Sequence, residues 1–333
     1  MWSALGLVTA AAAVFALTVG PLPIGLDQLL SALGIRSDSS LRAYETAAIV
    51  DLRLPRVTLA ILIGAALGSS GAAMQGLLRN PLADPGLIGV ASGAALSAAA
   101  FMVIGVTAWI PERLALPLAA FAGGSAAAWL VVRLSLVDGR SRVATMLLAG
   151  LALNAIAGAG IGFLSYIADD LALRSVTYWM FGSLGKAGWA ELAVAAPILA
   201  LCIVLLPRAA VPLNALLLGE AEAGHLGIDV DALRRRLLTL IVVAVAVSVA
   251  LAGIIGFVGL IVPHLLRLVT GPDHRLVIPG SALTGALLLL LADTASRALF
   301  VPAELPIGIF TALIGGPFFL ALLLRYRNAP ELS

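Results

Sequence analysis

Long apolar runs, broken by short stretches rich in glycine, proline and charge, follow one another along almost the whole chain. Most of them approach the roughly 20 residues that a helix needs to cross the hydrocarbon core of a bilayer. The pattern predicts ten spanning helices, at residues 2–20, 57–78, 86–108, 114–132, 143–168, 189–206, 237–255, 257–270, 276–296 and 306–324. We therefore predict an all-α integral membrane protein in which residues 1–333 form a single transmembrane domain.

Two of these runs need separate comment. The run 257–270 has only 14 residues, and the glycine-rich link Gly253–Gly259 before it leaves no room for a soluble loop. This predicts a broken or re-entrant helix. The run 2–20 has the length of a signal peptide, but no Lys or Arg precedes its apolar core, so we expect a retained span.

The composition agrees with a membrane protein and excludes several other classes. Of the 333 residues, 61% are apolar and 11% are charged, whereas soluble domains have about 45–50% and 25%. Disordered, collagen-like and nucleic-acid-binding proteins do not have this composition, and the net charge is only +2. The single cysteine, Cys202, excludes a disulfide framework and a multi-cysteine metal site.

Loop charges predict the orientation. Ten spans put both termini on one side, and a cytoplasmic location for them places 12 of the 20 basic residues inside. Because basic residues favour the cytoplasmic side, we predict that both termini are cytoplasmic. The polar segment 21–56 then lies outside, where it has room for short surface helices, and the segment 207–236 lies inside.

The spans lack the groups that an ion-coupled carrier uses. Their centres contain no Asp, Glu, Lys or Arg, and Gln75 and Asn154 are the nearest to polar interior groups. Ion-coupled transporters generally place ionisable or coordinating groups near the middle of the bilayer. The sequence therefore disfavours a secondary transporter.

The chain also lacks a nucleotide site and a metal-binding motif. A phosphate-binding loop needs G-x-x-x-x-G-K-[ST]. The only lysine, Lys186, has Met180 in place of the first glycine and Ala187 in place of Ser or Thr. The three histidines, at 225, 264 and 274, have no metal-ligand spacing. We predict no ATPase activity, no bound cofactor and no metal, and a structural role for His264.

The segment 207–236 is the densest in charge and is suited to contact a partner. Two short helices are expected in it, separated by Gly219 and ended by Gly224 or Gly227, with Glu220 and Glu222 in the first turn of the second helix. Such a helix could enter a groove of a cytoplasmic partner or lie on the lipid surface. The pattern alone does not choose between these two interpretations.

Several motifs together resemble a known family. They follow in order from about residue 50 to the C-terminus, at 52–56 (LRLPR), 71–75 (GAAMQ), 79–89 (RNPLADPGLIG), 219–223 (GEAEA), 256–267 (GFVGLIVPHLLR), 305–308 (LPIG) and 315–319 (GGPFF). This ordered set resembles the FecCD-type permeases of type II ABC importers, which carry ferric siderophores, haem and cobalamin.

The resemblance implies an assembly in the bacterial inner membrane. It implies a ten-helix permease fold that forms a homodimer with the transport pathway at its interface. Two copies of a cytoplasmic ABC ATPase subunit would hold the ATP, and a periplasmic substrate-binding protein would deliver the cargo. Two alternatives come from other classes of protein: a passive channel or ion-coupled carrier, and a membrane sensor without transport. Neither class needs an ATPase or a binding protein.

The resemblance also implies roles for particular residues. Docking of the binding protein is expected at Arg53, Arg56 and Arg297, whose alternative role is to anchor helix ends at the lipid headgroups. The cytoplasmic gate is expected around Asn80 and Leu82 and near Thr145. Contact with the ATPase is expected from Gly219, Glu220, Glu222, Gly224, Leu226 and Gly227.

The segments 166–185, 271–275 and 302–306 look most like those of haem-importing members. In this interpretation Arg174 meets a haem propionate, since a guanidinium can pair bidentately with a carboxylate. Alternatively, Arg174 pairs only with Asp169 or Asp170. Haem is the leading substrate, ferric siderophore the second and cobalamin the third, and we expect a pathway without an obligatory ligand to iron.

Overall fold

The structure is a computed structural model that describes residues 2–36, 42–105, 111–137, 140–141, 143–300 and 303–327. Its helices are α1 (Trp2–Thr18), α2 (Leu26–Ala32), α3 (Ala43–Ala47), α4 (Leu54–Leu77), α5 (Val90–Ile104), α6 (Glu112–Leu134), α7 (Val143–Ile167), α8 (Asp170–Met180), α9 (Trp189–Leu205), α10 (Ala210–Leu216), α11 (Glu220–His225), α12 (Val230–Ala252), α13 (Val258–Thr270), α14 (His274–Ala298) and α15 (Ile307–Arg327). One π-helical segment, η1 (Ala48–Arg53), and two 3₁₀ segments, η2 (Pro85–Ile88) and η3 (Leu206–Ala209), join them. Two short strands, β1 (Leu136–Val137) and β2 (Arg140–Ser141), pair antiparallel.

The ten expected spans all correspond to helices. Among the described residues, six helical stretches are long and apolar enough to cross a membrane, and four shorter apolar helices, α1, α5, α13 and α15, complete the set. Residues 106–108 of the expected third span lie outside the described part. The all-α membrane fold predicted from the apolar runs is thus confirmed.

Two helices begin earlier than the apolar runs indicate. The helix expected from residue 57 is continuous from Ala43 through η1 and α4. Pro55, which has no N–H to donate, lies where the π-helical segment η1 passes into α4, and the Val50 carbonyl before it accepts from Trp189 Nε1 at 3.0 Å. The helix expected from 237 begins at Val230, because the Asp229 side chain accepts a hydrogen bond from the Ala232 N–H. The arginines 234–236 are therefore helical, and the loop expected at 207–236 is shorter.

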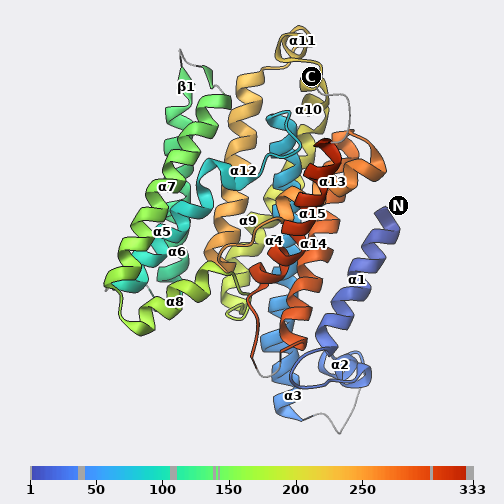
Figure 1. The fold of residues 1–333 in the computed structure, drawn as a ribbon. Coiled ribbons are helices and arrows are strands. Elements are labelled where there is room, and N and C mark those ends of the chain that lie inside the picture. The colour runs from blue at the N-terminus through green and yellow to red at the C-terminus, as the bar shows by residue number, and fades with distance from the viewer. Residues whose placement is uncertain are drawn as a thin grey trace.

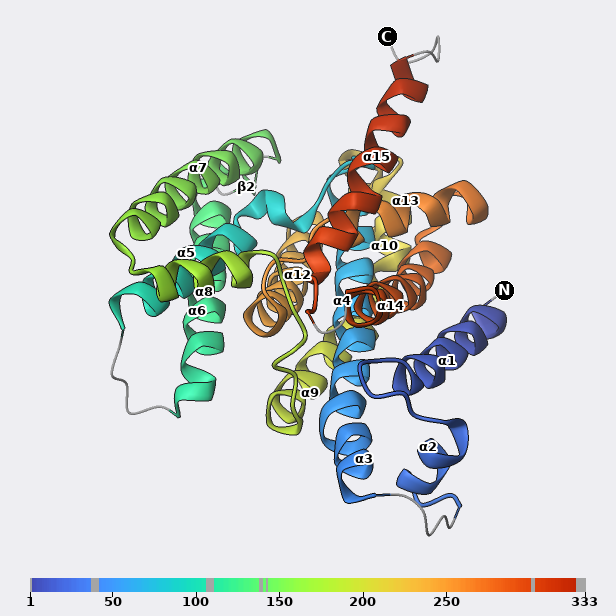
Figure 2. The same ribbon diagram turned by 60° about the horizontal axis from the view of Figure 1, so that its bottom comes forward.

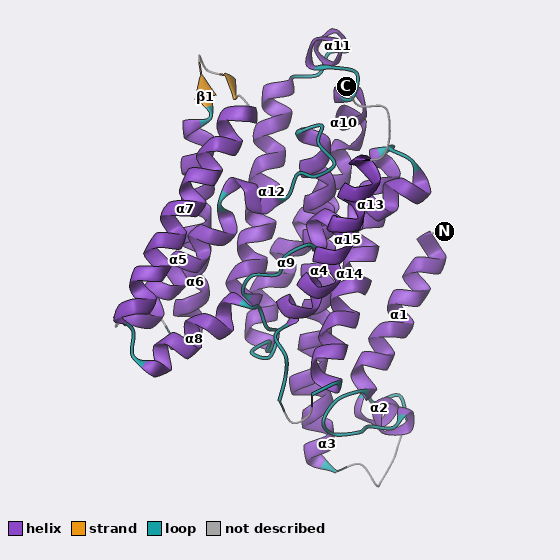
Figure 3. Cartoon of the chain, in the orientation of Figure 1, coloured by secondary structure: helices purple, strands orange, loops and turns teal. Residues whose placement is uncertain are grey.

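Helix α4 runs through the middle of the bundle (Figure 1). Helices α5 to α8 lie together on one side of it, and α1, α13, α14 and α15 lie on the other (Figures 1 and 2). Helices α10 and α11 and the strands lie at one end of the bundle, which we call the α11 end. Helices α2, α3 and α8 lie at the opposite end, which we call the α3 end (Figure 3).

Small residues let α4 approach its neighbours closely. A Cβ added at Gly64 would lie 2.3 Å from the Gly285 carbonyl oxygen, and one at Gly71 would lie 1.9 Å from that of Gly259. Backbone contact of this kind supplies packing energy in lipid, where the hydrophobic effect is absent. The small residues of segment 64–72 therefore form a helix contact with α13 and α14.

The link between α12 and α13 breaks the helix as the sequence predicts. Gly253 and Phe257 have φ values of 69° and 67°. Helix α13 has 13 residues, about 20 Å at the α-helical rise, so it does not span the bilayer alone. A neighbouring segment satisfies the backbone next to this break, because the Ser183 N–H donates to the Ala252 carbonyl at 2.7 Å.

Candidate functional site

Charged side chains from α4 and α14 form a buried network at the α3 end. The Arg56 Nε donates to Asp293 Oδ1 at 2.9 Å, and the Arg297 Nε donates to Asp293 Oδ2 at 3.1 Å. Asp293 is fully buried between the two guanidinium groups. Because each carboxylate oxygen faces a different arginine, one acid compensates two cations, one of them on its own helix and the other 237 residues away in the sequence.

The third arginine of this region, Arg53, joins Arg297 at the end of α1. Arg53 donates through Nη1 to the Leu17 carbonyl at 2.7 Å and through Nη2 to that of Leu22. Arg297 donates through Nη2 to the Ala16 carbonyl and through Nη1 to that of Val19, both at 3.0 Å. The last carbonyls of a helix lack partners within the helix and carry partial negative charge. The two guanidinium groups therefore cap α1.

The cluster Arg53–Arg56–Arg297 is thus turned into the protein. The three residues are 7%, 8% and 3% exposed. Their guanidinium groups neither project from the surface nor extend toward headgroups, which differs from both interpretations of the sequence. Docking of a binding protein on them stays a prediction, and this geometry does not favour it, because most of their donors are used within the chain.

Glu304 is the part of this network nearest to the surface. Its carboxylate accepts from Arg56 Nη1 at 3.0 and 3.2 Å, and its side chain is 36% exposed. The Tyr178 hydroxyl donates to the Glu304 carbonyl oxygen at 2.9 Å. The segment before α15 is therefore tied both to α4 and to α8 at the α3 end.

The turn expected to form a gate follows α4 directly. Asn80 closes it by accepting from the Leu82 N–H at 2.9 Å, and Arg79 before it has a φ of 49°. Asp84 accepts from the Gly86 N–H at 2.7 Å and starts η2. Burial raises the pKa of the Asp84 carboxyl, and this hydrogen bond partly offsets the effect. The turn between α4 and α5 is therefore held by hydrogen bonds that its own side chains accept.

Helix α7 packs against η2, which follows this turn. A Cβ at Gly150 would lie 1.9 Å from the Leu87 carbonyl oxygen, so α7 touches the η2 backbone. The Ser92 hydroxyl hydrogen-bonds Asn154, one of the two polar span residues noted in the sequence. Thr145 lies near the start of this helix, half-buried. The structure thus brings α7 beside the turn, but gating by Asn80, Leu82 and Thr145 stays a prediction.

Arg174 lies on the exposed side of α8. Of its two suggested partners, Asp169 caps α8 by accepting from the Ala172 N–H at 2.7 Å. Within the described residues no ion pair of Arg174 is found with Asp169 or Asp170. A pocket of about 590 Å³ lies behind this helix, lined by residues that include Ser175, Tyr178 and Lys186. Arg174 is therefore available to a carboxylate from outside the chain.

The two short helices expected in segment 207–236 are present as α10 and α11 at the α11 end (Figure 1). Gly219 separates them with a φ of 125°, and Gly227 follows α11 with a φ of 82°, values that favour glycine. Ala223 packs into the core, whereas Leu226 is 64% exposed and Gly224 meets nothing within 4 Å. Helix α11 therefore presents an open face to solvent.

The two acids of α11 have different surroundings. Glu220 accepts from Arg234 Nη2 at 2.7 Å, and Asp231 accepts from Arg234 Nη1 at 3.3 Å. The Arg234 side chain is buried, so this ion pair holds α11 on α12. Glu222 is exposed. Of the two acids, Glu222 is thus the better placed to contact a partner.

Helix α10 is fixed to the start of α14. The Asn214 Nδ2 donates to Asp273 Oδ1 at 2.6 Å, and its Oδ1 accepts from the His274 N–H at 2.9 Å. The hydrogen bond from Asn214 and that from the Arg275 N–H lower the pKa of the Asp273 carboxyl. These contacts connect the α10–α11 segment to a helix that contacts α4 along its length.

No group of metal-ligating side chains occurs in the described part of the chain. His264 is buried on α13, 6.1 Å from the Phe318 ring in an edge-on contact. Both of its buried ring nitrogens lack a hydrogen-bond partner among the described residues, and the structural role of His264 stays a prediction.

Sequence reasoning missed four residues that organise these sites: Asp293, Glu304, Asn214 and Arg234. It also missed α8 as a separate helix. An N-cap pattern at Asp169, with a second acid in the first turn, could have indicated it.

Comparisons with known proteins agree with this architecture. Residues 8–325 match the FecCD transport family. The chain has the fold of a metal-chelate type ABC transporter solved in an inward-facing conformation, with a TM-score of 0.84, 33% identity and coverage of 97% of this chain and 98% of that one.

Relatives of named function cover most of the chain. It is 49% identical over 283 residues to the hemin transport system permease protein HmuU of Yersinia pestis, covering 84% of each. It is 44% identical over 281 residues to the cobalamin import system permease protein BtuC of Halobacterium salinarum, covering 84% of this chain and 74% of that one. The vitamin B12 import system permease protein BtuC of Vibrio parahaemolyticus is 42% identical over 290 residues, covering 87% and 86%.

Proposed function

The chain belongs to the FecCD transport family, and on that premise we propose that it moves haem across the bacterial inner membrane. It is a multi-pass permease subunit of a type II ABC importer and not itself an ATPase. The type of importer implies a separate ATPase and a binding protein as partners. The energy for transport then comes from ATP held by the partner subunits, and this chain binds no cofactor.

The observation that carries the choice of haem is the relative named for hemin transport, which is 49% identical over 84% of both chains. The cobalamin relatives named above are 44% and 42% identical. The exposed Arg174 adds a chemical reason, because haem propionates are carboxylates and cobalamin has no comparable pair. Ferric siderophore and then cobalamin remain the alternatives.

Two copies of the chain form the pathway between them in this proposal. Helices α7 and α15 support it, since each carries an exposed face with small residues. Added Cβ atoms at Gly158, Gly162 and Gly316 would meet nothing within 4 Å. Small residues on a lipid-level face are typical of helix–helix contact, so a second copy is the partner that these faces fit.

We place the α11 end in the cytoplasm. Both ends of the described chain lie toward this end of the bundle (Figure 1). The open face of α11, with Glu222 and Leu226, then meets the ATPase, and the α3 end meets the binding protein. The segment around Asn80 and Leu82 lies toward the cytoplasmic side, where a gate would retain the cargo.

The experiment is reconstitution of the permease with its ATPase and binding protein in nanodiscs. We expect haem-loaded binding protein to stimulate ATP hydrolysis more than the same protein with a ferric siderophore or cobalamin. Arg174→Gln should raise the haem concentration needed for half-maximal transport, whereas Arg42→Gln, an exposed arginine elsewhere at the α3 end, should not. Equal stimulation by all three cargoes, or a preference for another one, would refute haem as the substrate.

A further inference from the structure

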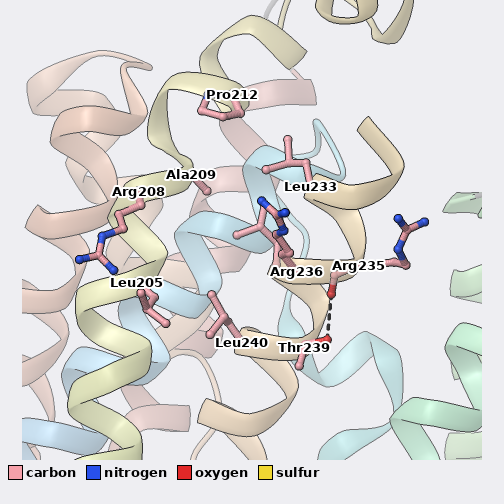
Figure 4. Close-up of a pocket in the computed structure, with 10 residues that line it drawn as sticks. Leu205, Arg208, Ala209, Pro212, Leu233, Arg235, Arg236, Thr239 and Leu240 are labelled. Atoms are coloured by element: carbon pink, nitrogen blue, oxygen red, sulfur yellow. Dashed lines mark hydrogen bonds between the residues drawn. The ribbon is translucent and has the colours of Figure 1, made fainter. Parts of the chain in front are cut away.

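A second pocket lies near the α11 end, between η3 and α10 on one side and α12 on the other. Its volume is about 590 Å³, within the about 300–1,000 Å³ usual for small-molecule sites. Figure 4 shows Arg208 on one wall and Arg236 on the other, while Arg235, which also lines the pocket, extends its guanidinium group away from Arg208. Leucine side chains, among them Leu205 and Leu240, line the remainder. The pocket thus combines an apolar wall with three cations.

The three arginines are not neutralised by the chain itself. All three are exposed, and in the described part of the structure none forms an ion pair or a side-chain hydrogen bond. The lining residues described for the pocket include no acid. The acids nearest in sequence, Glu220 and Asp231, pair with Arg234. A ligand for this pocket is therefore anionic at one end and apolar at the other.

The depth of the pocket points to a lipid. Arg208 lies 19 residues after Trp189, where α9 begins, and Arg236 lies 16 residues before Ala252, where α12 ends. At the helical rise these separations are about 28 and 24 Å, close to the about 30 Å thickness of the hydrocarbon core. The guanidinium groups then lie at the headgroup level of one leaflet, with the leucines facing the acyl chains.

We propose that this pocket binds an acidic phospholipid, with its phosphate between Arg208 and Arg236 and an acyl chain along the leucines. Anionic headgroups attract basic residues next to membrane spans, and basic pockets between spans bind such lipids. The site stands apart from the transport pathway and does not depend on the cargo being haem. Its neighbour Arg234 holds Glu220 of α11, so the bound lipid would fix the start of α12, to which α11 is attached.

The test measures binding of phosphatidylglycerol to the full-length permease in phosphatidylcholine nanodiscs, by native mass spectrometry after titration. Three exposed arginines serve as a charge-matched control; they lie just after α4, in the last turn of α6 and in the first turn of α14, whose ends lie toward the α11 end. The pocket variant is R208Q/R235Q/R236Q and the control variant is R79Q/R133Q/R275Q. At about fivefold per arginine, the pocket variant should bind about a hundredfold more weakly, and the control variant should bind as the wild type does.

Two further variants distinguish the contribution of the pocket's shape to lipid binding from that of its charge. Thr239→Trp adds bulk at an exposed lining position without changing charge and should also weaken binding. R236Q alone, expected to lose about fivefold, keeps the test valid if the triple variant does not fold.

Equal weakening in the pocket and control variants would show general surface attraction and overturn the proposal, as would unchanged binding in the pocket variant. The same variants are also tested for association with the ATPase in nanodiscs of pure phosphatidylcholine. If only the pocket variant loses this association, the occupant of the pocket is a protein and not a lipid.

Discussion

One cluster of three arginines lies toward each end of this molecule, and the surroundings of the two clusters are opposite. At the α3 end, Arg53, Arg56 and Arg297 are buried and hydrogen-bonded to Asp293, Glu304 and the last carbonyls of α1. Toward the α11 end, the arginines of the cluster Arg208–Arg235–Arg236 are exposed around an apolar pocket. The comparison teaches that an arginine at the end of a span can hold helices together or form part of a ligand site. Which role it has depends on whether carbonyls and acids of the chain hydrogen-bond to it.

The largest expected effect follows from removing the acid that the two buried arginines share. Asp293→Asn keeps the shape but leaves Arg56 and Arg297 without their common counter-charge. Breaking a buried ion pair costs about 3–5 kcal/mol. The unfolding temperature of the detergent-solubilised permease should therefore fall strongly. Asp170→Asn, on the exposed face of α8, is the matched control. Unchanged stability of Asp293→Asn would show that the network is not a structural tie.

A smaller effect is expected at the α11 end. Glu220→Gln removes the charge that holds α11 on Arg234, but Asp231 remains as a partner and the site is half-exposed. We expect a local loss of about 1 kcal/mol, seen as faster hydrogen exchange in α11 and weaker coupling of ATP hydrolysis to transport. Glu222→Gln should leave exchange unchanged and weaken only the association with the ATPase. Equal exchange in both variants would contradict the different roles of the two acids.

The third prediction tests whether the buried arginine cluster has an additional docking role. In that role, an acid of the binding protein would replace Glu304 as the partner of Arg56 during docking. Glu304→Gln removes the carboxylate that competes with this acid for Arg56. Arg56 is buried but Glu304 is 36% exposed, so water screens the pair and we expect it to contribute only about 1 kcal/mol. Affinity for the binding protein should therefore rise by up to about fivefold, with a larger gain at low salt. Unchanged affinity and salt dependence would leave Arg56 a structural residue only.

The smallest expected effect concerns pH. Hydrogen bonds from Asn214 and from the Arg275 N–H lower the pKa of Asp273 in the folded protein. The carboxylate therefore contributes stability above its unfolded pKa of about 3.9, and this contribution is lost as the pH falls through the lower folded value. Asp273→Asn should be less stable than the wild type at neutral pH, and the difference should shrink in acid. A difference in stability between wild type and Asp273→Asn that stays constant down to pH 2 would show that the Asp273 carboxylate charge is not its cause.

Much of the architecture could be predicted from the sequence because it depends on properties local in the chain. Apolar runs identified six helices long enough to cross a membrane and four shorter apolar ones, and Gly219 and Gly227 marked the limits of α11. The absence of a phosphate-binding loop around Lys186 was likewise visible in the sequence, and the family assignment is consistent with a permease that is not an ATPase. The helix boundaries at Ala43 and Val230 were missed, because charged residues continue a helix wherever capping and proline position allow it.

The sequence by itself thus determined where the helices are and which positions lie near their ends. Only the tertiary structure decided what those end residues do. Arg53 and Arg297 became caps of α1 because packing brings the carbonyls of Leu17 and Ala16 within reach, across 36 and 281 residues of chain. The position of a residue in an apolar run gives the depth of its side chain in the membrane. It does not say which distant backbone carbonyl or acid will contact that side chain.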